Sequence, residues 1–306
     1  MSRPIRIERP DLPVSVTVRC REGRRLLMPL GPIRELMLWR LAQAVELHGV
    51  LLYFVVQMGN HIHILCRAPQ GNLSAFMRHF LGYLARDVNK LLGRRGDGIF
   101  RRHSQVHVLD DAAALERASY ILANPARAHL VDSIDDWPGL SSAPAVLRGE
   151  RMVGRHFDER AWRRAGCPDD RSPFEQEIEL VHHRLPGYED LDDEAYAATI
   201  REVVATREAE ARAARTAPLP DPDALHDADP DSIPLRMKME PCPHCHATCA
   251  TAAHEYLETR KATRERYVVA STRWRQGDFA ADFPPGTYRP QVAWTGAASE
   301  RLRAAA

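Results

Sequence analysis

The sequence predicts an α+β fold in which two helices cover one face of an antiparallel sheet. Three observations support this prediction. Short runs with the apolar or alternating pattern of strands recur in the first half of the chain. Stretches with the amphipathic repeat of helices separate them. A Gly/Asn turn joins two of the apolar runs directly, which is typical of a β-hairpin.

The first strand and the first helix lie near the N-terminus. Residues 13–19 alternate between apolar and polar side chains, which predicts a strand. Gly31-Pro32 introduces a helix, and His48-Gly49 ends it in the manner of a C-terminal glycine. Its apolar stripe recurs every four residues at Ile33, Met37, Leu41 and Val45.

A hairpin and a second helix come next. Residues 50–56 and 60–65 are the predicted strands, and the turn between them contains Gly59. The helix begins after Asn72, a plausible N-cap, and extends to about Leu91. A basic loop of residues 93–98 follows it.

A fourth strand is predicted at residues 99–109, and Asp110-Asp111 caps a third helix that reaches Leu122. The first six elements are strand, helix, strand, strand, helix, strand. This order matches the split βαβ, ferredoxin-like arrangement, an antiparallel sheet with helices on one face. The second face is then available to the third helix.

The composition changes near residue 150, so we expect a catalytic domain of residues 1–148 and a mainly helical C-terminal extension of residues 149–306. Residues 217–241 are rich in Pro and Asp, which predicts a mobile acidic linker. Helical patterns occupy residues 174–181, 192–216 and 252–274.

Charge is unevenly distributed. Residues 1–131 contain 19 Lys/Arg and 10 Asp/Glu, a net charge of +9, and the whole chain has +1, so the remainder carries −8. A basic half indicates binding to a polyanion, and a chance distribution of solvated surface charges is the competing explanation.

The sequence predicts a cytoplasmic protein. No apolar run reaches the length of a membrane span, and the first residues lack the apolar core of a signal peptide. The six cysteines, three isolated and three clustered, do not form the pattern of a disulfide framework.

The hairpin carries a histidine pair. His61 and His63 are two residues apart on a predicted strand, so both project to one face while Ile62 and Ile64 project to the other. Two adjacent imidazoles are half of a divalent-metal site. The alternative is a pair of surface histidines on an edge strand, and His-x-His alone does not decide between them.

The third helix carries Tyr120 and, four residues later, Asn124, which places both on one helix face. Pro125 disfavours a helical conformation at the residue before it, so Asn124 could instead lie at the helix end. The competing explanations are a core tyrosine with a satisfied hydroxyl and an asparagine in a turn or cap.

Three segments, in this order, resemble the single-tyrosine HUH transposases, and most of all their REP-associated tyrosine transposase group. The resemblance covers roughly the first half of the chain. Trp137-Pro138-Gly139-Leu140-Ser141-Ser142 is similar to the segment that often follows. The three segments are Asn60-His61-Ile62-His63-Ile64-Leu65, Phe100-Arg101-Arg102 and Tyr120-Ile121-Leu122-Ala123-Asn124-Pro125-Ala126-Arg127-Ala128.

The resemblance implies an enzyme of DNA transposition that cleaves single-stranded DNA, often beside a hairpin, and transfers the strand. By position, Tyr120 would be the nucleophile that forms a 5′-phosphotyrosine, and His61, His63 and Asn124 would hold Mg²⁺ or Mn²⁺. A second copy of the chain is a candidate partner. Arginines would contact DNA phosphates, unless they are only solvated charges: Arg94, Arg95, Arg101, Arg102 and Arg127.

Two other functions stay open. One is a DNA-hairpin-binding protein that does not cut. The other is a metal-dependent phosphoesterase, which would need a third histidine or a carboxylate near the pair, and Cys66-Arg67-Ala68-Pro69 offers none.

A cysteine cluster lies in the extension. Cys242, Cys245, Cys249 and His254 could supply four ligands to a structural Zn²⁺. Only one close Cys-x-x-Cys pair is present, however, and free thiols in a loop before a helix are the alternative.

Overall fold

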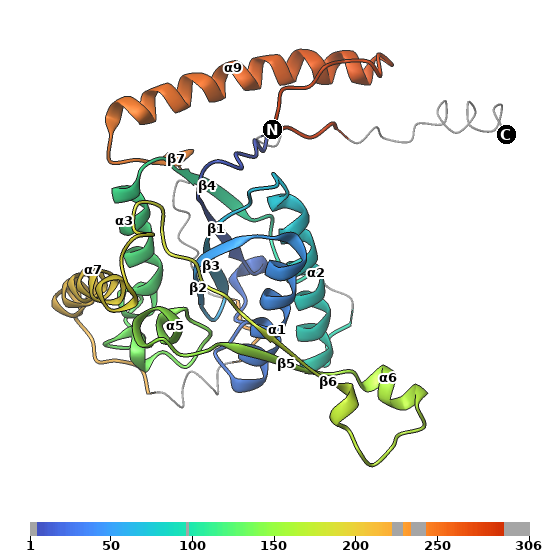
Figure 1. The fold of residues 1–306 in the computed structure, drawn as a ribbon, viewed down its shortest axis with the longest axis vertical. Coiled ribbons are helices and arrows are strands. Elements are labelled where there is room, and N and C mark those ends of the chain that lie inside the picture. Colours follow the sequence, from blue (N-terminus) through green and yellow to red (C-terminus); the bar gives the residue numbers. More distant parts are fainter. Residues whose placement is uncertain (1–4, 96–97, 222–228, 234–242, 291–306) are drawn as a thin grey trace. The chain divides into compact units, whose positions relative to one another are not determined.

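The computed structural model describes residues 5–95, 98–221, 229–233 and 243–290. The chain forms two compact units. The larger unit spans residues 10–250, and the smaller one combines residues 1–9 with residues 251–306. The predicted α+β class is confirmed for the larger unit, which contains a five-stranded mixed sheet with helices on both faces (Figure 1).

The sheet has the order β2-β3-β1-β4-β7. The first four strands in this order pair antiparallel, and β7 joins β4 in parallel. Because β3 lies between β2 and β1, its register is fixed from both sides. The strands are β1 (Val14–Arg19), β2 (Leu51–Gln57), β3 (His61–Arg67), β4 (Ser104–Val108) and β7 (Cys245–His246).

Strand β4 begins at Ser104, later than the predicted residue 99. Its partner β1 ends at Arg19, and the chain then turns through the short 3-10 helix η1 (Arg21–Gly23). Residues 99–103 therefore have no extended strand beside them with which to form a regular ladder. They keep only an isolated bridge between Phe100 and Cys20 and a few backbone hydrogen bonds.

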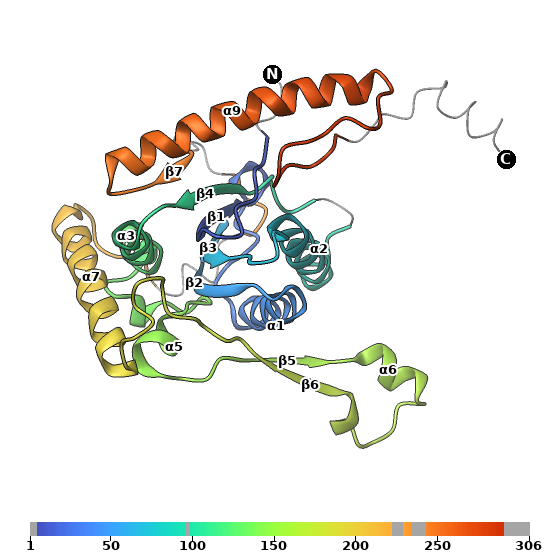
Figure 2. The ribbon, with the colours of Figure 1, turned by 45° about the horizontal axis from the view of Figure 1, so that its top comes forward.

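Helices α1 (Gly31–His48) and α2 (Leu73–Leu91) cover one face of the sheet and pack against each other (Figure 2). The predicted apolar stripe of α1 is buried. Helix α2 buries Leu73, Phe76, Met77, Phe80, Leu84 and Val88, while Leu91 is exposed. Both helices pack against the strand side chains that point to this face, among them Ile62 and Ile64. Burying one such side chain contributes roughly 1.5–3 kcal/mol, so this core holds the sheet and the two helices together.

Helix α3 (Asp111–Leu122) lies on the other face, followed by α4 (Asn124–Arg127) and α5 (Ala143–Arg148). The Asp110 carboxylate accepts a hydrogen bond from the Ala113 backbone N–H (2.8 Å), so the predicted cap of α3 is confirmed.

Helix α7 (Asp193–Ala214) packs on α3, α4 and α5 and confirms the helix predicted at residues 192–216 (Figure 2). Its buried side chains recur every four residues at Tyr196, Ile200 and Val204. Glu208 is only 7% exposed and accepts hydrogen bonds from the Ile134 N–H (2.7 Å) and the Ser133 hydroxyl (3.1 Å). Part of the extension is therefore built onto the first half of the chain. The assignment of catalysis to residues 1–148 stays a prediction.

The helix predicted at residues 174–181 is wrong. Residues 175–179 form β6 (Glu175–Glu179), which pairs antiparallel with β5 (Val153–Phe157) as a separate two-stranded sheet (Figure 1). Glutamate and glutamine are good helix formers, and Phe174, Ile178 and Val181 have the spacing of one helix face, so the local pattern favours a helix. Pairing with β5, including an Arg155–Glu177 ion pair (2.6 Å), decides the conformation. Between the strands lies the short helix α6 (Glu159–Arg164).

The segment Trp137–Ser142 binds the outer edge of β2. Trp137 donates its indole N–H to the backbone oxygen of Gln57 (2.8 Å), and the Ser142 hydroxyl accepts from the Val55 N–H (2.7 Å). The Gln57 side chain, which is fully buried, accepts from the Leu140 N–H (3.1 Å). The segment thus covers an edge that would otherwise expose unpaired backbone groups.

The smaller unit contains α9 (Ala250–Arg275), which confirms the helix predicted at residues 252–274. Glu8 binds the C-terminal stretch of this unit, donating its N–H to the Gly286 oxygen (2.8 Å) and accepting from the Tyr288 hydroxyl (2.5 Å). Of the predicted linker, residues 217–221 and 229–233 are irregular, and the rest lies outside the described residues. Within the described segments, no helix is both long and apolar enough to cross a membrane.

Gly154 tests the packing of the β5–β6 hairpin on α1. A Cβ at this position would meet backbone atoms of Trp39 at 2.7 and 2.9 Å, and a backbone cannot move aside as a side chain can. We expect Gly154→Ala to lower the free energy of unfolding by about 1–3 kcal/mol. Gly31→Ala, whose Cβ meets nothing within 4 Å, is the control. Urea unfolding measures both, and equal stabilities of the two variants would contradict this packing.

Candidate active site

The two histidines of β3 project from the face of the sheet that α3 covers. Ile62 and Ile64 enter the core formed with α1 and α2, as the alternation predicts, whereas Leu65 enters the core on the α3 side. The imidazole rings of His61 and His63 lie edge to face with their centroids 4.8 Å apart. His63 is only 4% exposed. A rigid central strand therefore holds both rings at a fixed separation.

Both rings are oriented through their Nδ1 atoms. The Nδ1–H of His61 donates to the Asn60 side-chain oxygen (2.6 Å), and Nδ1 of His63 lies 3.1 Å from the Thr17 hydroxyl. Thr17 is directly opposite His63 in the β1–β3 register, so the two side chains share a face. With Nδ1 protonated, Nε2 of each ring keeps its lone pair. This is the tautomer that a metal-binding histidine needs.

Asn124 brings a side-chain amide to the two rings. Helix α3 ends at Leu122 because Pro125 follows closely, and Asn124 begins the short α4 instead of continuing α3. Its side chain is 8% exposed, and its amide nitrogen lies 3.3 Å from Nε2 of His63. It also hydrogen-bonds His61. The amide therefore contacts both imidazoles, and rotation by 180° would present its oxygen to the same place.

Tyr120 lies in the last turn of α3, with its ring centroid 6.0 Å from that of His63. Two guanidinium groups lie against the tyrosine ring, that of Arg127 at 4.1 Å and that of Arg117 at 4.3 Å from the centroid. Arg117 is itself held by the Ser15 hydroxyl of β1 (3.1 Å). The structure thus brings together His61, His63, Tyr120 and Asn124, and it adds two positive charges beside the phenol.

The histidines are neutral at neutral pH. Burial, and then the charge of Arg19, lower the pKa of His61 to about 4, although the Asn124 hydrogen bond acts in the opposite direction. Burial lowers the pKa of His63 well below its usual value, and His61 and three arginines lower it further. Two neutral imidazoles and one amide oxygen are a donor set that Mg²⁺ or Mn²⁺ can accept, with positions left for other ligands. The described residues therefore fit the predicted metal.

The basic segment predicted to contact DNA, residues 100–102, lies beside the C-terminal end of β1. Arg101 donates its N–H to the backbone oxygen of Arg19 (2.8 Å), and Arg19 is opposite His61 in the register. Arg95, Arg101 and Arg102 are exposed. Arg94 instead forms an ion pair with Asp231 of the acidic linker, which also pairs with Arg24 (2.8 Å).

The predicted zinc cluster is only partly described. Cys242 lies outside the described residues. Cys245 is in β7, and Cys249 is exposed and precedes α9. In the part of the chain that the structure describes, no group of three or more His, Cys, Asp or Glu side chains is arranged to hold a metal. Zinc binding stays a prediction.

Four side chains around the site were not expected from the sequence: Thr17, Asn60, Arg117 and Arg19. The alternation of residues 13–19 does place Thr17 and Arg19 on one face, but only the β1–β3 register shows that this is the face of the histidines. Arg117 is three residues before Tyr120, a spacing that puts both on one side of a helix. That spacing is common and does not single out Arg117.

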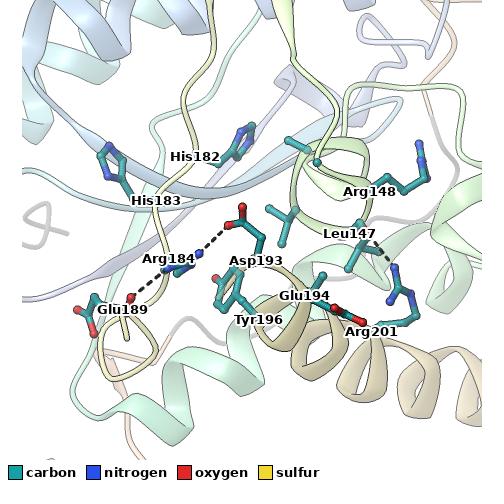
Figure 3. Close-up of a pocket in the computed structure, with 14 residues that line it drawn as sticks. Leu147, Arg148, His182, His183, Arg184, Glu189, Asp193, Glu194, Tyr196 and Arg201 are labelled. Atoms are coloured by element: carbon teal, nitrogen blue, oxygen red, sulfur yellow. Dashed lines mark hydrogen bonds and ion pairs between the residues drawn. The ribbon is translucent and has the colours of Figure 1, made fainter. Parts of the chain in front are cut away.

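A second cavity, of about 770 Å³, lies between α5, α7 and residues 182–189 (Figure 3). Its arginines are engaged within the protein: Arg184 binds Asp193 (2.6 Å), and Arg201 donates to the Leu147 oxygen (2.7 Å). The Ser142 hydroxyl lies 2.8 Å from Nε2 of His182, but this serine is fully buried and also binds the β2 edge. We therefore interpret the cavity as a space between packed elements and not as a second active site.

Comparisons with known proteins find similarity among solved structures. No family model matches the chain, and no curated protein matches it. The solved structure of a REP-associated tyrosine transposase bound to a REP hairpin is similar over 49% of this chain and 87% of that chain. The sequences are 20% identical there, and the TM-score is 0.41.

His182 couples folding to pH. Burial lowers its pKa to about 4. In the unfolded chain it takes up a proton below about pH 6.5, whereas the folded protein resists protonation until about pH 4, so acidification through this window favours unfolding. Wild type should therefore lose more stability than His182→Gln when the pH falls from 7 to 5. We expect the two losses in the free energy of unfolding to differ by on the order of 1 kcal/mol. Urea unfolding at both pH values measures this difference, and an unchanged pH dependence would contradict a neutral His182.

Proposed function

We propose that the chain is a metal-dependent enzyme that cuts single-stranded DNA with Tyr120 and transfers the cut strand. We infer that it acts in the cytoplasm on DNA hairpins or the single strands beside them. One observation carries the proposal: the sheet and α3–α4 place two neutral imidazoles, an amide and a tyrosine on one face. Basic segments at the end of β1 extend this face and suit a phosphate backbone.

The topology supports the same proposal. The elements β1, α1, β2, β3, α2 and β4, with the sheet order β2-β3-β1-β4, suit a ferredoxin-like core. In such a core, α1 and α2 occupy one face and leave the other for a site. The helix that follows β4 can then carry a nucleophile over that second face, as α3 carries Tyr120.

In the proposed reaction, the Tyr120 hydroxyl oxygen attacks the phosphorus of a DNA phosphodiester. The new O–P bond replaces the bond to the 3′ oxygen, which leaves as a hydroxyl and gains a proton from water, while the phenol proton goes to water. A 5′-phosphotyrosine results, and a 3′-hydroxyl can reverse the step. The phosphoester bond is exchanged and not lost, so no ATP is required.

Each residue has a role in this proposal. His61, His63 and Asn124 would hold Mg²⁺ or Mn²⁺, which supplies Lewis-acid stabilisation of the phosphate charge when bound. An ordinary phenol is a weak nucleophile at neutral pH. Arg117 and Arg127 flank the ring, and their charges favour the negative charge that develops on the phenol oxygen. They also hold the ring in place over the site.

A phosphoesterase that uses the histidine pair is less well supported. It would need a third histidine or a carboxylate beside the pair, and residues 5–95, 98–221, 229–233 and 243–290 contain no such cluster. The amide of Asn124 and the adjacent tyrosine fit the transferase better. A DNA-binding protein that does not cut would bind the hairpin without forming a covalent link to it.

Tyr120→Phe tests the nucleophile. We expect wild type with Mn²⁺ to form a DNA-linked protein band on a denaturing gel, using labelled single-stranded hairpin DNA that flanks its own gene. Tyr120→Phe lacks the attacking oxygen and forms none, whereas the control Tyr188→Phe forms the band as wild type does. Chelation of the metal with EDTA removes the band.

Cleavage that survives Tyr120→Phe would indicate a hydrolytic site and overturn the proposal. DNA binding without any covalent band in wild type would instead indicate the non-cutting protein.

The residues that orient the imidazoles are tested by metal binding. Thr17→Val removes the partner of His63 Nδ1, and Asn60→Ala removes that of His61 Nδ1. Loss of such a partner weakens metal binding by roughly 10–100-fold. We expect this loss in calorimetric titration with Mn²⁺, a readout that does not depend on cleavage. Thr206→Val, on the outer side of α7, is the control and should bind Mn²⁺ as wild type does. Unchanged Mn²⁺ affinity in both site variants would rule out metal binding by this pair.

A further inference from the structure

A groove lies on the outer side of α2, beside the C-terminal end of α1. Its volume is about 430 Å³. Six of its seven lining residues belong to α2 and recur at intervals of three, four or one, so they form one stripe along the helix. The lining residues, which we call the α2 groove, are His48, Ala75, Arg78, His79, Gly82, Tyr83 and Arg86.

The α2 groove is positively charged. No Asp or Glu is among its lining residues. Arg78 and Arg86 are exposed, and neither forms an ion pair within the described part of the chain. Arg40 also reaches the groove, 5.1 Å from the centre of the Tyr83 ring, but its charge is balanced by an ion pair with Asp87 (2.5 Å).

Two histidines of the groove have unsatisfied ring nitrogens. The rings of His48 and His79 lie edge to face with centroids 5.3 Å apart, and Nε2 of each is buried without a hydrogen-bond partner among the residues that the structure describes. Burial lowers the pKa of both, and Arg78 adds to the effect at His48. Unpartnered buried polar atoms are uncommon in folded proteins. The groove thus contains two polar ring atoms that an approaching ligand can hydrogen-bond.

The groove also has an aromatic wall. The Tyr83 ring is 39% exposed, stacks obliquely with His79 (4.7 Å between centroids) and lies 4.1 Å from the Arg86 guanidinium carbon. Guanidinium groups that bind phosphates, next to an accessible aromatic ring that can stack on a base, are the pair of features that single-stranded nucleic acids require.

We propose that the α2 groove is an accessory site for single-stranded DNA, in which Arg78 and Arg86 bind a phosphodiester and Tyr83 contacts a neighbouring base. The inference rests on the proposed function, because the strand is the DNA that the active site cuts. Helices α1 and α2 cover the sheet face opposite to the one that carries His61 and His63. The groove therefore holds DNA that lies outside the cleaved segment.

Gly82 offers a variant that changes the groove without harming the fold. A Cβ there meets nothing within 4 Å, and glutamate and glutamine are both better helix formers than glycine. Gly82→Glu introduces a negative charge into the groove, and Gly82→Gln introduces the same shape without the charge. Any difference between the two variants is therefore electrostatic.

The test is fluorescence anisotropy of the full chain with a labelled hairpin that carries a long single-stranded flank. We expect Gly82→Glu to weaken binding about tenfold relative to Gly82→Gln. The double variant Arg78→Gln/Arg86→Gln should weaken it similarly and reduce the slope of log K against log salt by about 0.7, the value for one phosphate of a single strand. The exposed arginines of α6, changed in Arg160→Gln/Arg164→Gln, are the matched control and should leave binding within twofold of wild type.

Two further arms separate the explanations. Inorganic phosphate in a thermal-unfolding assay shows whether the groove takes the free anion. Phosphate stabilisation that these variants lose, with unchanged DNA affinity, would overturn the proposal in favour of a small-anion site, and unchanged behaviour in both assays would also overturn it. A DNA-linked band in wild type combined with unaltered DNA affinity of the variants overturns only this inference. A groove-dependent affinity without any covalent band overturns only the enzymatic proposal.

Discussion

The alternation of β3 between its two neighbours is the constraint on which the candidate site depends. Ile62, Ile64 and Cys66 enter the core with α1 and α2, so His61 and His63 must face the other side. A shift of one residue would place both histidines in that core and expose the isoleucines. Because β3 is paired on both edges, such a shift would break the hydrogen bonds to β1 and to β2 as well as the packing of the core. The energy that fixes the fold thus also fixes the spacing of the two imidazoles.

The second half of the site depends on packing that comes from later in the chain. Tyr120 and Asn124 belong to α3 and α4, and α7 packs on both helices. A buried glutamate of α7, Glu208, is held by hydrogen bonds to the segment that follows α4. The extension therefore contributes to the position of the proposed nucleophile. The boundary predicted at residue 148 therefore divides elements that pack against each other, and it stays a prediction.

Much of the fold could be predicted from the sequence because its elements are locally consistent. The stripe of α1, the alternation of β1 and the Asp110 cap each follow from side chains close in the chain. The hairpin of β5 and β6 could not, since its residues favour a helix locally and only cross-strand pairing overrules them. The same distinction applies to the site. His61, His63, Tyr120 and Asn124 stand in recognisable patterns, whereas Thr17 acquires its role only through the register between β1 and β3.

The arginines near the site have three different surroundings, and the differences bear on how the protein would bind DNA. Arg117 and Arg127 are placed against the Tyr120 ring, so their charges lie at a fixed distance from the proposed nucleophile. Arg95, Arg101 and Arg102 are exposed, so they offer a surface for phosphates without a defined geometry. Arg94 is already bound to Asp231 of the acidic linker, and a DNA phosphate would have to displace that carboxylate. Affinity for DNA would then depend on the linker as well as on the arginines, because both anions compete for the same guanidinium.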